Sequence, residues 1–393
     1  MSAYLPHQIE KSDEASTVLR KYGLAYIFGQ PRSGKTATAI RVCERSQKQR
    51  ILVLTPKNAI PGWRSELDRT SATKDYTVTN YEQASKLNPA DYDFAIIDEA
   101  HRVGRVGKPT KRITEIKRLT HALPVLYLSG TPIVETPLAI YYQFSLTKYS
   151  PLRQYPTFYK FFRDFGIPNQ MRINGRYIEQ YNRHRPELLT VIEPYIVRMT
   201  QADAGISVQA EDVLHVVPLR DSTKQLIQKV KEDAVITLDG ELVAFESDMA
   251  ERLAVHQIEY GALKVGDDYA DLDNREVVDY ILQTWGDTEG LALMCHYKST
   301  RMKLEKHFKR AQIFSSTAHA EGVSLAHFEH FVIVGTCFSG AKHVQRRERG
   351  ININKKTGSV VNHIVTDDGI SRAVYNAVSK KKDFNLQMYR STR

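Results

Sequence analysis

The sequence predicts an α/β protein of two lobes, each built on a parallel sheet with helices on both faces. Short apolar runs alternate with amphipathic segments over the first 150 residues, which is typical of buried parallel strands joined by helical crossovers. The same alternation resumes after residue 206, and 393 residues are enough for two ordinary domains. The strands predicted in the first lobe are 24–28, 51–55, 75–79, 94–97 and 124–128.

A phosphate-binding loop follows the first predicted strand. Residues 29–36 read Gly-Gln-Pro-Arg-Ser-Gly-Lys-Thr and fit the pattern G-x-x-x-x-G-K-[ST] between a strand and a helix. In such a loop the backbone N–H groups cradle phosphates, the lysine neutralises the β- and γ-phosphates and the hydroxyl ligates Mg²⁺. The sequence therefore predicts binding of ATP with Mg²⁺ by Gly29, Pro31, Arg32, Ser33, Gly34, Lys35 and Thr36.

Two carboxylates follow the strand predicted at 94–97. Asp98 stands at the carboxyl end of that strand, where ligands bind in open α/β sheets, and is expected to hold Mg²⁺. Glu99 comes next and is expected to polarise the attacking water as general base. Alone, the pair could be a strand end followed by a helix-capping acid, but beside a phosphate loop it predicts hydrolysis.

The second half of the chain begins after an aromatic segment. Residues 151–200 are predicted to form a helical insertion, and the polar stretch 200–205 a hinge between lobe 1 (1–205) and lobe 2 (206–393). Lobe 2 is expected to contain a helix at 275–284 and a hairpin across 239–241. Its other predicted strands are 213–219, 291–295, 312–315, 331–335 and 361–365.

The charge favours a polyanionic partner. The formal net charge is +10, and Lys and Arg side chains that neutralise phosphates release counterions. Arg102 and Arg105 begin a basic cluster directly after Asp98 and Glu99, which is either a nucleic-acid track or a solvated face. The cysteines Cys43, Cys295 and Cys337 are far apart in apolar settings and are expected to be buried thiols. No signal peptide or membrane span is predicted, so we expect a cytoplasmic protein.

In their order along the chain, these pieces resemble a superfamily 2 helicase or translocase of the Swi/Snf-like branch, including its compact phage members. Residues 29–36 are similar to motif I, and Asp-Glu-Ala-His at 98–101 to motif II, a DEAH box. Residues 128–133, Leu-Ser-Gly-Thr-Pro-Ile, are similar to motif III. The resemblance implies two tandem RecA-like lobes with a helical protrusion after motif III.

The resemblance also implies roles for residues of lobe 1. Gln8, in Leu5-Pro6-His7-Gln8, would read the adenine. His101, Ser129 and Thr131 would couple the ATP site to the nucleic acid. The nucleic-acid backbone would be contacted by Thr55, Pro56 and Lys57 of motif Ia and by Thr79, Asn80 and Tyr81 of motif Ib.

Lobe 2 resembles the family through motifs IV to VI, but only about fifteen residues separate IV from V, so the lobe looks shortened by one strand and helix. Gln345 would be a coupling residue and Gly322 a nucleotide contact. An arginine that reaches the γ-phosphate would be Arg349 in either register of motif VI, or Arg346 in one of them. The predicted nucleic-acid contacts are His296, Tyr297 and Lys298 of motif IV and Ser316 and Thr317 of motif V.

The resemblance implies an ATP-driven motor that moves on duplex, forked or branched DNA with little sequence preference, for example in branch migration. The helical protrusion favours duplex DNA, and we expect a monomer. Two alternatives remain open: an RNA-directed helicase of the same superfamily, and an ATP-gated clamp that grips nucleic acid without moving.

Overall fold

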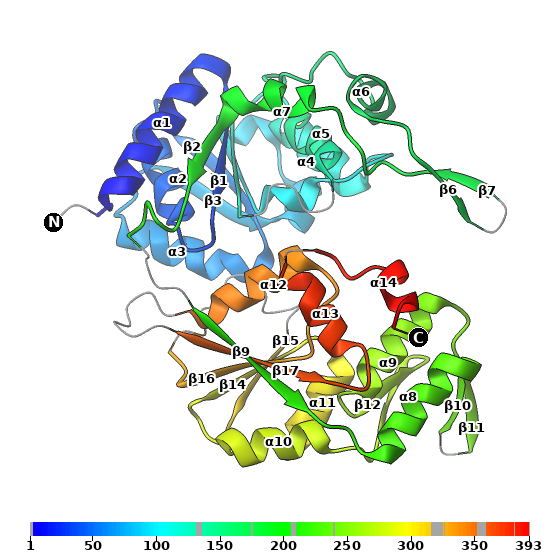
Figure 1. The fold of residues 1–393 in the computed structure, drawn as a ribbon. Helices are drawn as coiled ribbons and strands as arrows, with labels where there is room; N and C mark the ends of the chain where they lie inside the picture. The colour runs from blue at the N-terminus through cyan, green and yellow to red at the C-terminus, as the bar shows by residue number, and fades with distance from the viewer. Residues whose placement is uncertain are drawn as a thin grey trace. The chain divides into compact units, whose positions relative to one another are not determined.

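The computed structural model describes residues 3–130, 136–173, 176–205, 210–238, 240–315, 325, 327–351, 359–380 and 382–392. The chain forms two compact units, Met1–Ser207 (lobe 1) and Val208–Arg393 (lobe 2), and each is described by itself. Each unit contains one parallel sheet covered by helices (Figure 1). The predicted α/β class is therefore confirmed.

The sheet of lobe 1 has six parallel strands in the order β3-β2-β4-β5-β1-β8. The five strands predicted from the apolar runs are all present, each to within one residue at either end. The strands are β1 Leu24–Gly29, β2 Arg50–Thr55, β3 Asp75–Asn80, β4 Phe94–Asp98, β5 Val125–Ser129 and β8 Ile196–Met199.

Helices cover both faces of this sheet, because alternate side chains of its strands enter two different cores. One core packs against α1 Pro6–Tyr22, α2 Lys35–Glu44 and α3 Ile60–Arg69. The other packs against α4 Lys111–Thr120, α5 Ile140–Phe144, α6 Phe158–Phe165 and α7 Glu187–Ile192. Short 3-10 helices lie at Lys57–Ala59, Tyr81–Lys86, Pro89–Asp91, Ala100–Val103, Pro137–Ala139 and Glu193–Tyr195.

The segment 151–200 is less uniformly helical than the sequence suggests. Helices α6 and α7 flank an antiparallel hairpin, β6 Gln170–Ile173 and β7 Arg176–Glu179, which projects from the lobe in Figure 1. The segment then ends in β8, which pairs in parallel with β1. Three phenylalanines of α6, Phe158, Phe161 and Phe165, enter the core, and the Phe161 ring lies 5.0 Å from the Tyr141 ring of α5.

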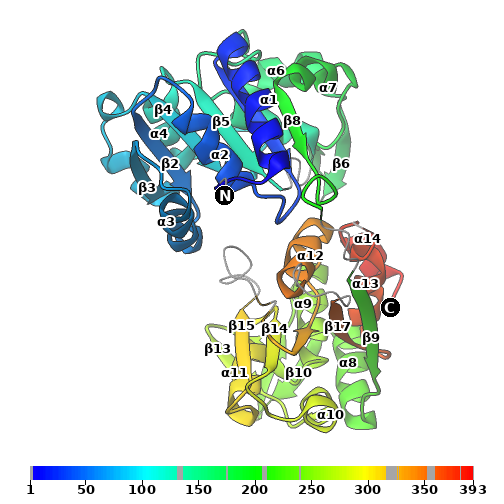
Figure 2. The same cartoon turned by 90° about the vertical axis from the view of Figure 1, so that its left-hand side faces the viewer.

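Lobe 2 carries five parallel strands in the order β15-β14-β16-β17-β9 (Figure 2). The predicted hairpin is present as β10–β11, and a second one, β12–β13, was not predicted. The strands are β9 Glu211–Val217, β10 Val235–Leu238, β11 Glu241–Ala244, β12 Ala262–Val265, β13 Asp268–Asp271, β14 Leu291–Cys295, β15 Gln312–Ser315, β16 His330–Val334 and β17 Val360–Thr366. The helices are α8 Asp221–Asp233, α9 Asp248–Ile258, α10 Glu276–Trp285, α11 Lys298–His307, α12 Gly340–Arg347, α13 Ser371–Val378 and α14 Leu386–Arg390, with a 3-10 helix at Glu348–Gly350.

All three cysteines are free and buried, as expected: Cys43, Cys295 and Cys337. Burial raises the pKa of the Cys43 thiol well above its ordinary value and that of Cys295 to about 12, so both are protonated at neutral pH. Within the described ranges, no helix combines the length and the apolar character that crossing a membrane requires.

Candidate functional site

The carboxyl edge of the lobe 1 sheet brings the predicted ATP motifs side by side. The strand order places β4, β5 and β1 next to one another. Phe28 of β1 pairs with Ser129 of β5, and Asp98 of β4 pairs with Leu128 of β5. Motifs I, II and III, which are separated in the sequence, therefore meet at the edge where parallel α/β sheets bind ligands.

The phosphate loop turns between β1 and α2 through two residues with positive φ. Arg32 has φ +64° and Gly34 has φ +86°, a conformation that costs little only at glycine. A Cβ on Gly34 would also lie 2.4 Å from Nε2 of Gln8. Position 34 therefore requires glycine both for its backbone and for the approach of α1.

The Lys35 side chain folds back over its own loop. Its Nζ donates to the carbonyl oxygens of Gly29 at 2.9 Å and Gln30 at 3.1 Å. A Cβ on Gly29 would meet Lys35 Cγ at 2.5 Å, so that glycine leaves room for the lysine stem. The ammonium group is thus held where the motif requires a cation.

Gln8 lies beside the loop, near the start of α1. Its Oε1 accepts from the Leu5 N–H at 2.9 Å, which fixes the side chain as part of the helix start. The neighbouring His7 Nε2 lies 3.0 Å from the Ser33 carbonyl oxygen. The predicted adenine-reading residue is therefore packed against the phosphate loop, although one of its polar atoms already serves the helix.

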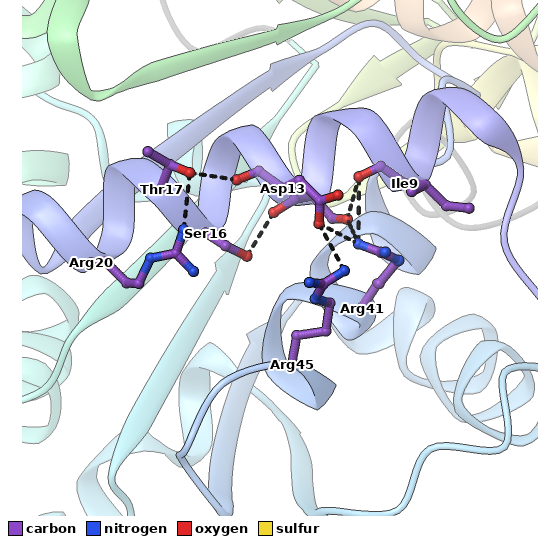
Figure 3. Close-up of polar contacts among 8 residues, drawn as sticks. Ile9, Asp13, Ser16, Thr17, Arg20, Arg41 and Arg45 are labelled. Atoms are coloured by element: carbon purple, nitrogen blue, oxygen red, sulfur yellow. Dashed lines mark hydrogen bonds and ion pairs between the residues drawn. The ribbon is translucent and has the colours of Figure 1, made fainter.

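An ion-pair cluster joins α1 to α2 (Figure 3). Nη1 of Arg41 in α2 donates to Ser12 Oγ at 2.5 Å and to Asp13 Oδ1 at 2.7 Å, and it lies 3.4 Å from the Ile9 carbonyl oxygen. Arg45 adds a longer contact of 3.2 Å to Asp13. The hydrogen bond from Arg41 holds the pKa of Asp13 below its usual range. The helix that carries Gln8 is thereby fixed to the helix that begins at Lys35.

Asp98 is buried and tied to two neighbouring elements. Its Oδ2 accepts from Thr55 Oγ1 at 2.7 Å and from Trp63 Nε1 at 2.8 Å, and its Oδ1 accepts from the Glu99 N–H at 3.0 Å. Burial, followed by the charge of Glu99, raises the pKa of Asp98 to about 6, while the bonds from Trp63 and Thr55 and the charge of Lys35 oppose the rise. The carboxylate is poised to change charge just below neutral pH.

Glu99, His101 and Ser129 form a connected group at the same edge. His101 Nδ1 lies 3.0 Å from Ser129 Oγ and 3.3 Å from Glu99 Oε2. Glu99 adopts φ +50°, an uncommon conformation for a non-glycine residue that is often found at functional sites. The predicted base and two of the predicted coupling residues are thus in direct contact.

Thr36 and Asp98 suit a Mg²⁺ ion by their chemistry. Both offer oxygen, the ligand that Mg²⁺ prefers, and Mg²⁺ usually takes only one or two protein ligands beside phosphate and water. No group of three or more His, Cys, Asp or Glu residues able to hold a metal occurs in the described part of the chain. The sparse oxygen donors therefore fit an ion that arrives with a nucleotide.

Two predicted nucleic-acid contacts need correction. Thr55 is 0% exposed and Tyr81 2% exposed, and both serve Asp98, since the Tyr81 hydroxyl donates to the Asp98 carbonyl oxygen. Neither side chain has surface to offer a ligand. Thr55 ends the buried strand β2 and Tyr81 follows β3, and both side chains turn inward where the motif alone suggested a surface.

The other predicted contacts of motifs Ia and Ib have mixed positions. Pro56 is buried, Lys57 is exposed and Thr79 is half-buried. Asn80 is half-buried, and its Oδ1 accepts from the N–H groups of Glu82 at 3.1 Å and Gln83 at 3.2 Å, so it caps the 3-10 helix that follows. Lys57 is the residue of this group best placed for a ligand.

Arg102 and Arg105 are both exposed and line a pocket of about 690 Å³ with His101. The sequence places Arg102 and Arg105 directly after motif II, and the structure shows that both line the same cavity as His101 of that motif.

In lobe 2 the predicted residues make contacts inside the lobe. Arg346 of α12 is 2% exposed, and its Nη2 lies 3.5 Å from His296 Nδ1. Its Nε and Nη1 have no hydrogen-bond partner among the described residues, and burial lowers its pKa. The Tyr297 hydroxyl lies 2.8 Å from His256 Nδ1, whereas Lys298 is exposed. A buried guanidinium with spare donors is typical of a functional position.

Arg349 lies in the 3-10 helix Glu348–Gly350 and is half-buried, and Gln345 lies on α12 and is half-buried. The predicted residues Thr131, Ser316, Thr317 and Gly322 lie outside the described residues.

The resemblance places Trp63 in the region of motif Ia, but its hydrogen bond to Asp98 was not predicted. Trp63 stands in α3, 35 residues before its partner, and is 2% exposed. The contact between Gln143 and Tyr26 was not predicted either. The hydroxyl of Tyr26, in the strand β1 that leads into the phosphate loop, donates to Gln143 Oε1 at 2.5 Å.

The fold and this edge give a protein of two α/β lobes in which a phosphate-loop pattern lies beside two adjacent carboxylates. Residues 72–258 match the family model described as SNF2-related domain. This part of the chain is therefore similar to the SNF2-related family, in line with the resemblance of its motifs. The match begins after the phosphate loop, so motif I is supported by its own pattern and geometry.

Among solved structures, the chain is similar to one described as "Sulfolobus solfataricus SWI2/SNF2 ATPase core in complex with dsDNA". The identity is 15%, the TM-score is 0.43, and the similarity covers 96% of this chain and 90% of that chain. No curated protein is significantly similar to the chain.

Proposed function

We propose that the chain is a DNA-dependent ATPase that uses hydrolysis to move along DNA. The observation that carries the proposal is the connected group of Glu99, His101 and Ser129 beside the phosphate loop. This group offers a base for water and a path from that base to a neighbouring strand. The SNF2-related match and the net charge of +10 support nucleic acid as the partner.

In the proposed reaction, Glu99 accepts a proton from water while the water oxygen bonds to the γ-phosphorus. The bond from that phosphorus to the β–γ bridging oxygen breaks, and ADP leaves with the electron pair. Lys35 offsets negative charge on the phosphates, and Thr36 and Asp98 would hold Mg²⁺, which supplies further charge neutralisation. An arginine of lobe 2, Arg349 first and Arg346 second, would stabilise charge in the transition state.

The proposed task is the remodelling of forked or branched DNA, including branch migration, by a monomer of the compact phage type. Contacts to phosphate and sugar would give little sequence preference. A helicase that separates strands and a translocase that only moves are both versions of this proposal.

A substrate panel tests the proposal. ATP turnover is measured with duplex DNA, single-stranded DNA, a fork, a four-way junction and RNA, and stimulation by duplex or forked DNA is expected. Stimulation by RNA alone would instead indicate an RNA-directed helicase. Displacement of a third strand from a triplex then separates a motor from an ATP-gated clamp, because a clamp displaces nothing.

The first prediction concerns Lys35. Lys35→Ala should lower ATP turnover by about 100-fold or more, because the phosphates lose their point charge, while DNA binding persists. Turnover and DNA affinity are measured on the same preparation. Lys86→Ala, an exposed lysine of the same lobe, is the control and should change neither. Retained turnover in Lys35→Ala would remove the motif I assignment.

A further inference from the structure

The pocket beside motif II is basic, and no acidic side chain is among the described residues that line it. Its volume is about 690 Å³, and the cationic or titratable residues that line it are His101, Arg102, Arg105, Lys111 and Arg112. The rest of the lining is aliphatic or neutral and polar. Arg112 pairs with Glu82 at 2.9 Å, whereas Lys111 makes no hydrogen bond or ion pair with any described residue. The pocket therefore keeps an excess of positive charge.

Two walls of this pocket are also part of the candidate ATP site. His101 contacts both Ser129 and Glu99. Gln143, another lining residue, accepts from the hydroxyl of Tyr26, which belongs to the strand that ends at Gly29. A ligand in the pocket would consequently touch side chains that hold the base and the phosphate-loop strand.

We propose that this pocket binds a phosphodiester group of the nucleic-acid backbone. Binding there would change the position of Glu99 through the contact that Glu99 makes with His101. The proposal rests on the proposed function, since it gives a nucleic-acid-dependent ATPase a place where the nucleic acid is sensed. The arginine and lysine side chains of the described lining favour phosphate, and guanidinium groups match its oxygens by paired hydrogen bonds.

The lining also distinguishes the backbone from a free nucleotide. The described residues that line the pocket include no aromatic side chain, so they offer a base no stacking partner. Its cationic side chains Arg102, Arg105 and Lys111 are exposed, which suits a ligand that continues beyond the cavity. The volume exceeds that of one phosphate group and accepts the attached sugars. Binding here carries no sequence information.

The relay runs through one short turn. His101 and Arg102 both belong to the 3-10 helix Ala100–Val103, which directly follows Glu99. A phosphate that attracts Arg102 and Arg105 would shift this turn and, with it, the His101 contact to Glu99. Nucleic acid would then change the rate of hydrolysis as well as its own residence on the protein.

The test uses the full chain with Arg105→Ala, Lys111→Ala and the double variant. ATP turnover is measured against the concentration of duplex DNA at several salt concentrations. The double variant should need about tenfold more DNA for half-maximal stimulation, and the salt dependence of binding should weaken by about one unit of slope per charge removed. Lys117→Ala, on the same helix but outside the pocket lining, should behave as the wild type.

The relay has its own readout, the turnover at saturating DNA. It should stay at least threefold below the wild-type maximum in the double variant, and full recovery would overturn the relay. If the double variant needs no more DNA for half-maximal stimulation than Lys117→Ala does, the pocket does not bind the nucleic acid. If the protein binds AMP more tightly than DNA, and Lys111→Ala abolishes that binding, the ligand of the pocket is a free nucleotide and the proposed backbone contact is wrong. A wild-type protein whose turnover no nucleic acid stimulates would instead overturn the proposed function.

Discussion

At the residue scale, the proposed role of Asp98 requires an ionised carboxylate, whereas its burial disfavours ionisation. Each hydrogen bond to the ionised carboxylate offsets part of the cost of burial. Thr55 and Trp63 provide two such bonds, both to Oδ2. The indole of Trp63 therefore acts on the protonation of the site although it has no role of its own in the proposed chemistry.

The pH dependence of turnover follows from this arrangement. The pKa of Asp98 is raised to about 6, so the ionised form is lost as the pH falls through that value, and kcat/KM for MgATP should fall with it. In Trp63→Phe the ionised form loses a donor, the pKa rises further, and the acidic limb should move up by about one pH unit. Trp285→Phe, at the other tryptophan, is the control. An unmoved limb in Trp63→Phe would contradict the role of the indole.

Gly34 gives a second prediction at this scale. Gly34→Ala places a Cβ at φ +86° and against Gln8 Nε2, so the loop must shift. The strain of about 1–2 kcal/mol for a left-handed residue corresponds to a rise of about tenfold in the KM for ATP. Gly62→Ala is the matched control, since a Cβ there meets nothing within 4 Å. Equal KM values in the two variants would contradict the constraint.

At the scale of helices and strands, some elements could be predicted from the sequence and others could not. The strands of lobe 1 were predictable from apolar runs bounded by turns, because burial on both faces leaves little freedom in composition. Strand β8 was missed since it has four residues and follows helices directly; only its pairing with β1 makes it a strand. The bond from Trp63 to Asp98 was missed for the same reason: it depends on where α3 packs, which no local pattern contains.

The joint between α1 and α2 leads to a prediction at the element scale. Arg41→Ala removes the contacts to Ser12, Asp13 and Ile9 and should let α1 move away from the phosphate loop. The KM for ATP should rise by about tenfold. Discrimination against GTP should fall, because Gln8, the predicted adenine-reading residue, is part of α1. Arg45→Ala removes one exposed 3.2 Å contact and should have little effect. Similar losses in both variants would show that the helix joint is not specific to Arg41.

At the scale of the whole molecule, the proposal needs an arginine from lobe 2 for an ATP site in lobe 1. Arg349→Ala should lower kcat by about 100-fold or more with little change in nucleotide affinity, since the contact is made in the transition state. Lys342→Ala on α12 is the control.

A larger loss in Arg346→Ala would shift the role to that residue. Because Arg346 is buried, its variant also needs a melting curve, so that a loss of folding is not taken for a loss of catalysis. The choice between the two arginines was open in the sequence, because the local pattern fits two registers.

The buried thiols of Cys43, Cys295 and Cys337 have a practical consequence for the study of a two-lobed protein. All three thiols are buried and buried thiols react slowly, so the natural chain offers maleimide dyes no ready target. One cysteine introduced on the surface of each lobe can therefore be labelled without removing any native residue. Single-molecule fluorescence could then follow the distance between the lobes through each ATP cycle in an otherwise unaltered protein.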